Sequence, residues 1–244
     1  MADVALLIDQ GNTRLKWVLA RAGEIDENSA GQGDPEAFMQ ACRNDASILP
    51  ASALISSVAS KEEARVLAGF CESRWGLKAQ LLESTEQLGG VHNAYREPKM
   101  LGVDRWLAIV GAVARHGKPV VIWDLGTATT LDAVDETGLH LGGMIYPGPA
   151  TMLDSLSRDT KLRVPPNLES SAVTPGRSTA ACISNGVYVA QVGVLNQFLR
   201  NISAKMGGEP LLVVTGGAAS QILPLLDFQY IHDPWLVFRG MLVG

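Results

Sequence analysis

Two short loops carry the residue types that could bind the phosphates of a nucleotide. Asp9-Gln10-Gly11-Asn12-Thr13 follows an apolar run at 4–8, and Asp124-Leu125-Gly126-Thr127 follows a second apolar run at 120–123. In each loop the glycine lets backbone N–H groups approach phosphate oxygens closely, where a Cβ would intrude. The threonine hydroxyl adds a donor, and a carboxylate at the end of a buried strand suits hydrated Mg²⁺, which needs few protein oxygens. The pattern therefore predicts a two-part grip for ATP and Mg²⁺.

A single Asp-x-Gly loop between two strands is usually only a hairpin turn, and this interpretation has to be weighed first. Its recurrence after a second buried strand favours phosphate binding. Lys16 would add a positive charge if its side chain faces the phosphates, and the turn Thr215-Gly216-Gly217-Ala218 could receive an adenosine or simply connect a strand to a helix. The sequence contains no G-x-x-x-x-G-K-[ST] loop and no G-x-G-x-x-G after a strand, so ATP would be held by neither of those grips.

Apolar runs of strand length alternate with stretches at helical spacing, which is typical of α/β folds. The expected strands are 4–8, 15–20, 53–55, 120–123, 129–134, 139–145 and 211–214, and the expected helices are 35–43, 61–75, 102–115 and 178–204. The polar segments 24–36 and 159–178 are expected to be loops. Because the order of strand, Asp-x-Gly loop and strand occurs twice, we predict two similar halves, 1–116 and 117–244, whose loops face each other across a cleft.

The bulk composition restricts the class of protein. Hydrophobic residues make up 47% and charged residues 18% of the chain, as in an ordinary compact protein. The net charge is −5 with no run of like charges, which argues against nucleic acid or an anionic membrane as a partner. The chain has no signal-peptide pattern and no stretch of about 20 apolar residues, so we expect a cytoplasmic protein.

Cysteines and histidines show no pattern of a disulfide framework or metal site. The three cysteines, Cys42, Cys71 and Cys182, are far apart and form no C-x-x-C, so we expect reduced, buried thiols. The four histidines have no metal-ligand spacing and no hydrolase signature around them, so structural or surface roles are expected.

Further motifs give the two loops a family context. Tyr95, the run Leu101-Gly102-Val103-Asp104-Arg105-Trp106, the run Gly142-Gly143-Met144-Ile145-Tyr146-Pro147-Gly148 and Thr179 follow the first loop in order. The paired loops resemble the actin/hexokinase/Hsp70 superfamily, and these further stretches resemble the type III pantothenate kinases. The resemblance covers residues 9 to 217 and implies an α/β fold of two ribonuclease-H-like lobes, with mixed sheets flanked by helices.

The resemblance implies transfer of the ATP γ-phosphoryl group to the primary hydroxyl of pantothenate, the first step of coenzyme A synthesis. It makes Asp104 the proton acceptor and Asp124 a ligand of a monovalent cation, K⁺ or NH₄⁺. It implies a homodimer in which the partner subunit closes part of the substrate pocket. It assigns ATP binding to Asp9, Gln10, Gly11, Asn12, Thr13, Arg14, Leu15, Lys16 and Thr127, and pantothenate binding to Tyr95, Gly102, Val103, Asp104, Arg105 and Thr179.

Each of these assignments has a simpler alternative. Asp104 could be a first-turn carboxylate that the helix dipole stabilises, Arg105 a solvated charge, and Tyr95 a surface aromatic. Two other functions also stay open: another small-molecule kinase of the superfamily, acting on a sugar or a carboxylate, and an ATP-binding regulatory protein without catalysis. Trp106 and Trp123 are expected in the core, because each lies on an apolar stripe or run.

Overall fold

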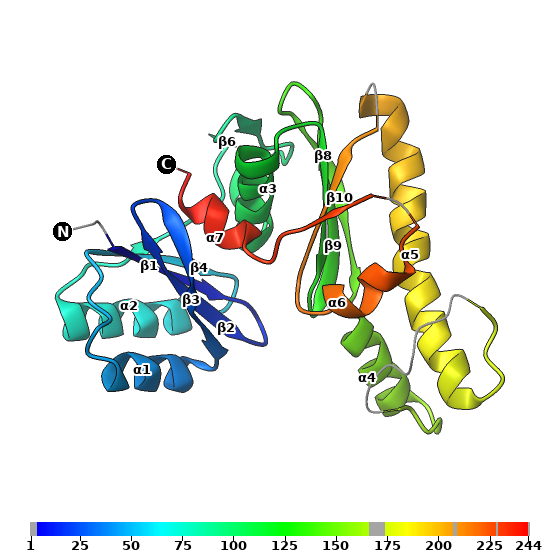
Figure 1. The fold of residues 1–244 in the computed structure, drawn as a ribbon, viewed down its shortest axis with the longest axis horizontal. Helices are drawn as coiled ribbons and strands as arrows, with labels where there is room; N and C mark the ends of the chain where they lie inside the picture. Colours follow the sequence, from blue (N-terminus) through cyan, green and yellow to red (C-terminus); the bar gives the residue numbers. More distant parts are fainter. Residues whose placement is uncertain (1–3, 166–173, 207–208, 228, 244) are drawn as a thin grey trace. The chain divides into compact units, whose positions relative to one another are not determined.

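The chain forms two compact units in a computed structural model that describes residues 4–165, 174–206, 209–227 and 229–243. Unit 1 comprises Met1–Arg115 with Trp235–Gly244, and unit 2 comprises His116–Pro234 (Figure 1). The sequence-based division had assigned 235–244 to the second half. These residues pack in unit 1 instead, because they carry the helix α7 (Leu236–Met241), whose Phe238 and Met241 are buried there.

Unit 1 contains a five-stranded mixed sheet in the order β3-β2-β1-β4-β5. The central strand β1 (Val4–Gln10) pairs antiparallel with β2 (Leu15–Arg21) and parallel with β4 (Ser52–Ser57), and the outer strands are β3 (Glu24–Gly33) and β5 (Gln80–Leu81). A short hairpin, β6 (Gln87–Leu88) and β7 (Val91–His92), and a 3-10 turn at Pro98–Met100 follow.

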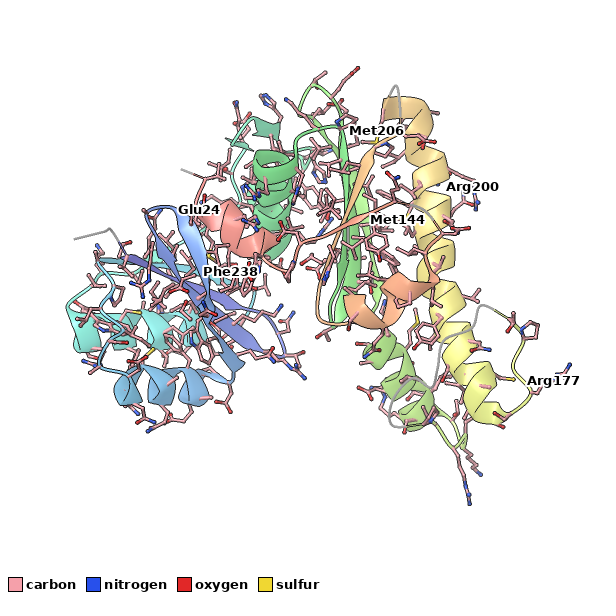
Figure 2. All side chains as sticks on the ribbon, in the orientation of Figure 1. Glu24, Met144, Arg177, Arg200, Met206 and Phe238 are labelled. Atoms are coloured by element: carbon pink, nitrogen blue, oxygen red, sulfur yellow. The ribbon has the colours of Figure 1, made fainter. Side chains whose placement is uncertain are left out.

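Helices cover both faces of this sheet. Leu6 and Ile8 of β1 pack with Phe38 of α1 (Pro35–Asn44) and Leu67 of α2 (Lys61–Trp75). The intervening Leu7 packs on the opposite face, with residues of α3 (Val103–His116) and α7; Figure 2 shows Phe238 of α7 there. Since both faces of β1 are buried, the strand is a continuous apolar run rather than an alternating one.

Unit 2 repeats the strand order of unit 1. Its sheet has the order β10-β9-β8-β11-β12, and the central β8 (Val120–Leu125) again pairs antiparallel with the next strand, β9 (Ala128–Val134), and parallel with the fourth, β11 (Leu211–Thr215). The edge strands are β10 (His140–Pro147) and β12 (Ile231–His232). The predicted internal repeat of strand and loop is therefore present in the topology.

The long helix α5 (Thr179–Met206) covers one face of the second sheet. Leu195, Phe198 and Met206 pack against strand residues such as Trp123, whereas Arg200 on the same helix points to solvent (Figure 2). The remaining elements are α4 (Pro149–Asp159), α6 (Ala219–Ile222) and the 3-10 turn Leu223–Leu225. Among the residues that the structure describes, no helix is long and apolar enough to cross a membrane.

Two sequence-based expectations are corrected by the structure. Segment 24–36 is not a loop, because β3 spans most of it as an edge strand paired with β2, and α1 then begins at Pro35. Cys182 is exposed rather than buried, whereas Cys42 and Cys71 lie in the core of unit 1. Burial raises the pKa of Cys42 to about 12 and that of Cys71 to about 11, so both thiols stay protonated and unreactive.

The polar segment 159–178 agrees with its expectation where it is described. Residues 160–165 and 174–178 belong to no helix or strand, and 166–173 lie outside the described residues.

Candidate active site

The first loop is a tight turn between β1 and β2. The Gly11 N–H donates to the Arg14 carbonyl oxygen at 3.0 Å, which closes the turn. Asn12, Thr13 and Arg14 at its tip are exposed. A Cβ at position 11 would lie only 3.3 Å from the Arg14 oxygen, so the turn is narrow where a ligand would approach the backbone.

Asp9 and Lys16 lie opposite each other where the two strands of this turn pair. Directly opposed side chains of antiparallel strands share one face of the sheet, so the carboxylate and the ammonium group are on the same side. Alternation places them on the face of Leu7, which packs with Val103 and Leu107 of α3. The first loop therefore offers its charged side chains on the side of the sheet that carries α3.

Val58, the residue after β4, lies between the end of β1 and the beginning of α3. The Val58 N–H donates to the Gln10 carbonyl oxygen at 3.1 Å, and a Cβ on Gly102 would lie 4.0 Å from Val58 Cγ1. Gln10 is buried, and its Oε1 accepts a hydrogen bond from the Ser57 hydroxyl at 3.0 Å. Gln10 thus anchors the loop through its side chain.

Asp104 occupies the first turn of α3, where backbone N–H groups favour a carboxylate. The Trp106 N–H donates to the Gly102 carbonyl at 2.9 Å, and the Arg105 N–H donates to Asp104 Oδ1 at 2.7 Å. A Cβ on Gly102 would lie 2.7 Å from that same Oδ1. Glycine at 102 therefore leaves the space into which the half-buried Asp104 carboxylate turns.

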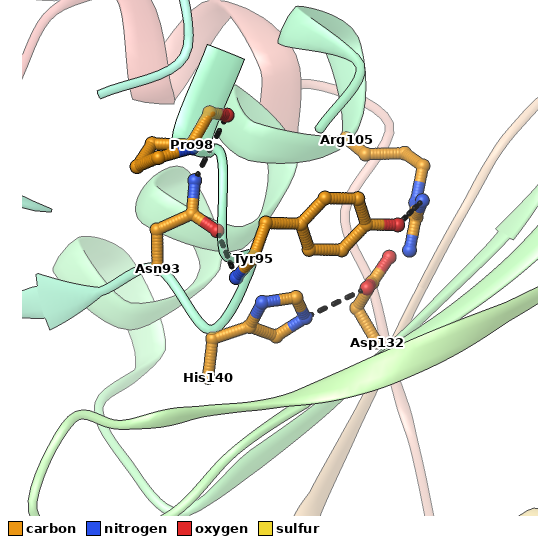
Figure 3. A network of polar contacts seen from close by, with 6 residues as sticks. All are labelled: Asn93, Tyr95, Pro98, Arg105, Asp132 and His140. Atoms are coloured by element: carbon orange, nitrogen blue, oxygen red, sulfur yellow. Dashed lines mark hydrogen bonds and ion pairs between the residues drawn. The ribbon is translucent and has the colours of Figure 1, made fainter. Parts of the chain in front are cut away.

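Tyr95 and Arg105 form a second part of the site in unit 1. Arg105 Nη1 donates to the Tyr95 hydroxyl at 3.0 Å, and the guanidinium carbon lies 5.9 Å from the centroid of the Tyr95 ring (Figure 3). Arg105 is only 8% exposed, which is unusual for arginine and excludes the solvated-charge interpretation. A buried, oriented guanidinium suits a planar anion such as a carboxylate.

The second loop packs against the turn after β11. Asp124, the last residue but one of β8, lies beside Thr215 in the parallel register, and the Ala218 N–H donates to the Leu125 carbonyl at 3.0 Å. Gly216 has φ +95°, and a Cβ there would lie 2.5 Å from Asp124 Oδ1 as well as against the backbone of Leu125. Only glycine combines this conformation with so close an approach.

The corner between β10 and α4 completes the surroundings of the second loop. The Gly148 N–H donates to the Thr127 carbonyl at 3.0 Å, and a Cβ on Gly148 would collide with the Gly126 carbonyl. The Thr151 hydroxyl donates to the same Thr127 carbonyl at 2.6 Å. At each of the glycines 126, 148 and 216 a Cβ would lie within 3.1 Å of a backbone atom of a neighbouring residue. Glycine at these positions therefore lets the second loop, the β10–α4 corner and the turn after β11 pack together at backbone distance.

Trp123 and Tyr146 tie the second loop into the core. The Trp123 indole N–H donates to the Tyr146 hydroxyl at 2.9 Å, which links β8 to the edge strand β10. Burial raises the pKa of Tyr146 to about 12, so its hydroxyl stays neutral at physiological pH. Trp106 and Trp123 are fully buried, as predicted for core residues.

Thr179 begins α5 and is exposed. It lines a surface pocket of about 790 Å³ together with Leu156, Arg177, Cys182 and Ile183. This pocket belongs to unit 2, whereas Tyr95 and Arg105 belong to unit 1. Within unit 1 the first loop and Gly102 lie on either side of Val58, and Tyr95 contacts Arg105. Within unit 2 the second loop packs against Gly148 and Gly216.

Sequence reasoning missed several polar residues of the two units. Asn93 holds the Tyr95 backbone, and Gln191 is fully buried between the Thr129 hydroxyl and the Pro147 carbonyl, both at 3.0 Å. Buried His140 contacts Asp132 at 2.9 Å in the second sheet (Figure 3). The signal for Gln191 was its polarity within an otherwise apolar stretch of α5, but that signal does not identify its partners.

The described part of the chain contains no group of three or more His, Cys, Asp or Glu side chains arranged to hold a metal ion. Asp9 and Asp124 are half-buried carboxylates, each near the end of a central strand. A carboxylate in such a position fits a cation that keeps its waters or binds phosphate oxygens at the same time, as Mg²⁺ does.

Comparisons with solved structures show which proteins share this fold. The chain is similar to a Baf family protein from Campylobacter jejuni, with a TM-score of 0.63 at 21% identity over 97% of this chain and 94% of that one. It is also similar to the ethanolamine utilization protein EutJ from Carboxydothermus hydrogenoformans, with a TM-score of 0.54 at 11% identity over 98% and 88%. With the repeated sheet order, these likenesses confirm the predicted fold of two α/β lobes with mixed sheets flanked by helices.

Sequence comparisons narrow this class to one family. The model of the type III pantothenate kinases matches residues 5–201. The type III pantothenate kinase of Paraburkholderia phymatum is 34% identical over 99% of this chain and 94% of its own length, and that of Herminiimonas arsenicoxydans is 36% identical over 97% and 95%. The chain belongs to the type III pantothenate kinase family.

Proposed function

We propose that this protein transfers the γ-phosphoryl group of ATP to the primary hydroxyl of pantothenate and thereby opens coenzyme A synthesis. Membership of the family is the observation that carries this proposal. The buried Arg105 supports it independently, because pantothenate is an anion and its carboxylate would pair with the guanidinium. Tyr95, Gly102, Val103 and Arg105 of unit 1 would bind pantothenate, and Thr179 at the start of α5 is proposed as a further pantothenate-binding residue.

In this proposal Asp104 is the proton acceptor. The pantothenate hydroxyl oxygen attacks the γ-phosphorus, the bond from that phosphorus to the bridging oxygen breaks, ADP leaves, and the hydroxyl proton passes to the Asp104 carboxylate. Phosphoryl transfer has a loose transition state, so positioning and charge neutralisation matter more than a strong base. A half-buried carboxylate at a helix N-terminus meets that modest need.

Each of the two loops is proposed to contact ATP. The exposed tip of the first loop would present its backbone N–H groups to the phosphates, with Lys16 adding a positive charge and Mg²⁺ neutralising the rest when bound. The second loop would add Thr127, and the turn Gly216-Gly217 would receive the nucleoside, since a Cβ on Gly217 would meet nothing within 4 Å. The full set of proposed ATP residues is Asp9, Gln10, Gly11, Asn12, Thr13, Arg14, Leu15, Lys16 and Thr127.

Two wider properties belong to the same proposal. We place the reaction in the cytoplasm, which the three free cysteines support, and we propose a homodimer whose partner subunit closes part of the pantothenate pocket. Exposed apolar side chains on the edge strand β10, Met144 and Ile145, support a contact with a second subunit.

Coupled ADP release with pantothenate, Mg²⁺ and K⁺ tests the proposed activity directly. We expect turnover that depends on pantothenate and is absent with a panel of sugars and other hydroxy acids. Turnover with a panel member but not with pantothenate would favour another small-molecule kinase. ATP binding without any ADP release would favour the regulatory alternative and contradict the proposal.

Asp124 is proposed as the ligand of a monovalent cation, K⁺ or NH₄⁺. A Cβ on Gly126 would lie 3.6 Å and one on Gly216 2.5 Å from Asp124 Oδ1, so backbone borders this carboxylate, and carbonyl oxygens would complete the coordination of a monovalent cation. We expect Asp124→Ala to abolish the activation by K⁺ that the wild type shows in ADP-release assays. Asp154→Ala, which removes an exposed carboxylate from α4 in the same unit, should retain that activation.

An Asp124→Ala enzyme that is still activated by K⁺ and only requires more ATP would contradict the cation assignment. It would assign Asp124 to the nucleotide instead.

A further inference from the structure

Asn93 is the polar centre of the segment that leads from the β6–β7 hairpin to α3. Its Oδ1 accepts the Tyr95 N–H at 3.0 Å, and its Nδ2 donates to the Pro98 carbonyl oxygen at 3.3 Å (Figure 3). Nδ2 also donates to the Thr85 carbonyl oxygen at 3.1 Å. Its backbone N–H donates to the Glu86 carbonyl at 2.9 Å. One amide side chain therefore joins Thr85, before the hairpin, to Tyr95 and Pro98 in the segment after it.

This use of the side chain requires an amide. An asparagine offers one acceptor and two donors at short reach, and here the acceptor and both donors of Asn93 are engaged. Aspartate would keep the acceptor but place an oxygen against the two carbonyls, and alanine would lose all three bonds. Regular secondary structure cannot hold this segment in place, because β6 and β7 have two residues each and 93–97 belong to no helix or strand.

The position that Asn93 fixes is that of Tyr95, and Tyr95 in turn contacts Arg105. The Tyr95 hydroxyl accepts from Arg105 Nη1 at 3.0 Å, and the guanidinium lies over the Tyr95 ring. A shift of the Tyr95 backbone would move both the hydroxyl and the ring face that hold this buried guanidinium. The contacts thus run from Asn93 through Tyr95 to Arg105.

We propose that Asn93 is a positioning residue for the anionic substrate, holding Tyr95 so that Tyr95 holds the Arg105 guanidinium in the orientation that binds a carboxylate. The inference rests on the proposed pantothenate phosphorylation and adds to it a residue that touches neither substrate nor ATP. It predicts an effect on the affinity for pantothenate that leaves the affinity for ATP in place.

Steady-state kinetics of Asn93→Ala test this inference. We expect the KM for pantothenate to rise by about 10- to 100-fold, because small misplacements of a binding group have effects of this size, while the KM for ATP changes by less than about twofold. Asn44→Ala is the matched control: Asn44 also accepts a side-chain hydrogen bond in unit 1, at 2.9 Å from Gln40, but at an exposed helix end. It should leave both KM values unchanged.

A double-mutant cycle with Tyr95→Ala distinguishes positioning from general support of the fold. If Asn93 acts through the hydroxyl and ring of Tyr95, Asn93→Ala should change the KM for pantothenate by less than about threefold when Tyr95→Ala is already present. Effects that multiply independently would overturn the inference, as would an unchanged KM for pantothenate in Asn93→Ala. If Asn93→Ala does not fold, the cycle is run with Asn93→Asp, and the same two outcomes decide.

The wild type in the same assay separates this inference from the proposed function. Absence of pantothenate turnover in the wild type would overturn both. Normal wild-type turnover with independent effects in the cycle would overturn the role of Asn93 alone.

Discussion

Replacing Asp104 with asparagine should lower kcat for pantothenate phosphorylation by about 10²- to 10⁴-fold, the usual contribution of a general base. Asparagine has nearly the same shape and can still accept the Arg105 N–H bond that Asp104 Oδ1 accepts at 2.7 Å, so the start of α3 should stay intact. It cannot take the hydroxyl proton. ADP-release kinetics at saturating ATP should therefore show a loss in kcat with little change in the KM for pantothenate.

Glu36→Gln is the matched control for this change. Glu36 lies in the first turn of α1 as Asp104 lies in the first turn of α3, so both substitutions remove one charge from a helix N-terminus of unit 1. If Asp104 served only the helix dipole, both variants would lose about 0.3–1 kcal/mol of stability and neither would lose activity. A kcat within about threefold of the wild type in Asp104→Asn would contradict the base assignment and leave the helix-dipole interpretation.

The sheets were predictable because their central strands are buried on both faces. Such strands are continuous apolar runs, as at Leu6-Leu7-Ile8, and the glycine of the following loop marks where each one ends. The edge strand β3 has no comparable signal, since its polar residues are half-exposed and it takes its register from β2. The helix α7 was missed for another reason: it has six residues and is stabilised by contacts with distant segments rather than by its own periodicity.

The candidate site was predictable only where a residue type is chemically distinctive. Asp104 and Arg105 stand out beside a helix start, and the loop glycines stand out between strands. Positions 148 and 216 require glycine because a Cβ there would collide with a neighbouring loop. This constraint exists only once the chain is folded. Asn93 acts through carbonyl groups of residues 85 and 98, whose proximity to it no sequence spacing reveals.

Replacing Gly111 with alanine should destabilise unit 1 by about 2–3 kcal/mol, at the upper part of the usual range for an overpacked core. Gly111 lies in the middle of α3, and a Cβ there would collide with the Leu236 carbonyl of α7 and lie 2.8 Å from the Gly240 nitrogen. Gly240 makes the reciprocal approach, because a Cβ on it would collide with the Leu107 carbonyl. Since the obstructing atoms are backbone, relief requires that one helix moves.

Gly69→Ala gives this prediction a control of opposite sign. Gly69 is also inside a helix of unit 1, α2, but it is exposed and a Cβ there would meet nothing within 4 Å. Alanine should therefore stabilise the protein by about 0.5–1 kcal/mol through its higher helix propensity. Thermal unfolding followed by circular dichroism should show a lower midpoint for Gly111→Ala and a higher one for Gly69→Ala. An equal or higher midpoint in Gly111→Ala would mean that α7 does not pack on α3 at backbone distance. It would contradict the assignment of the C-terminal segment to unit 1.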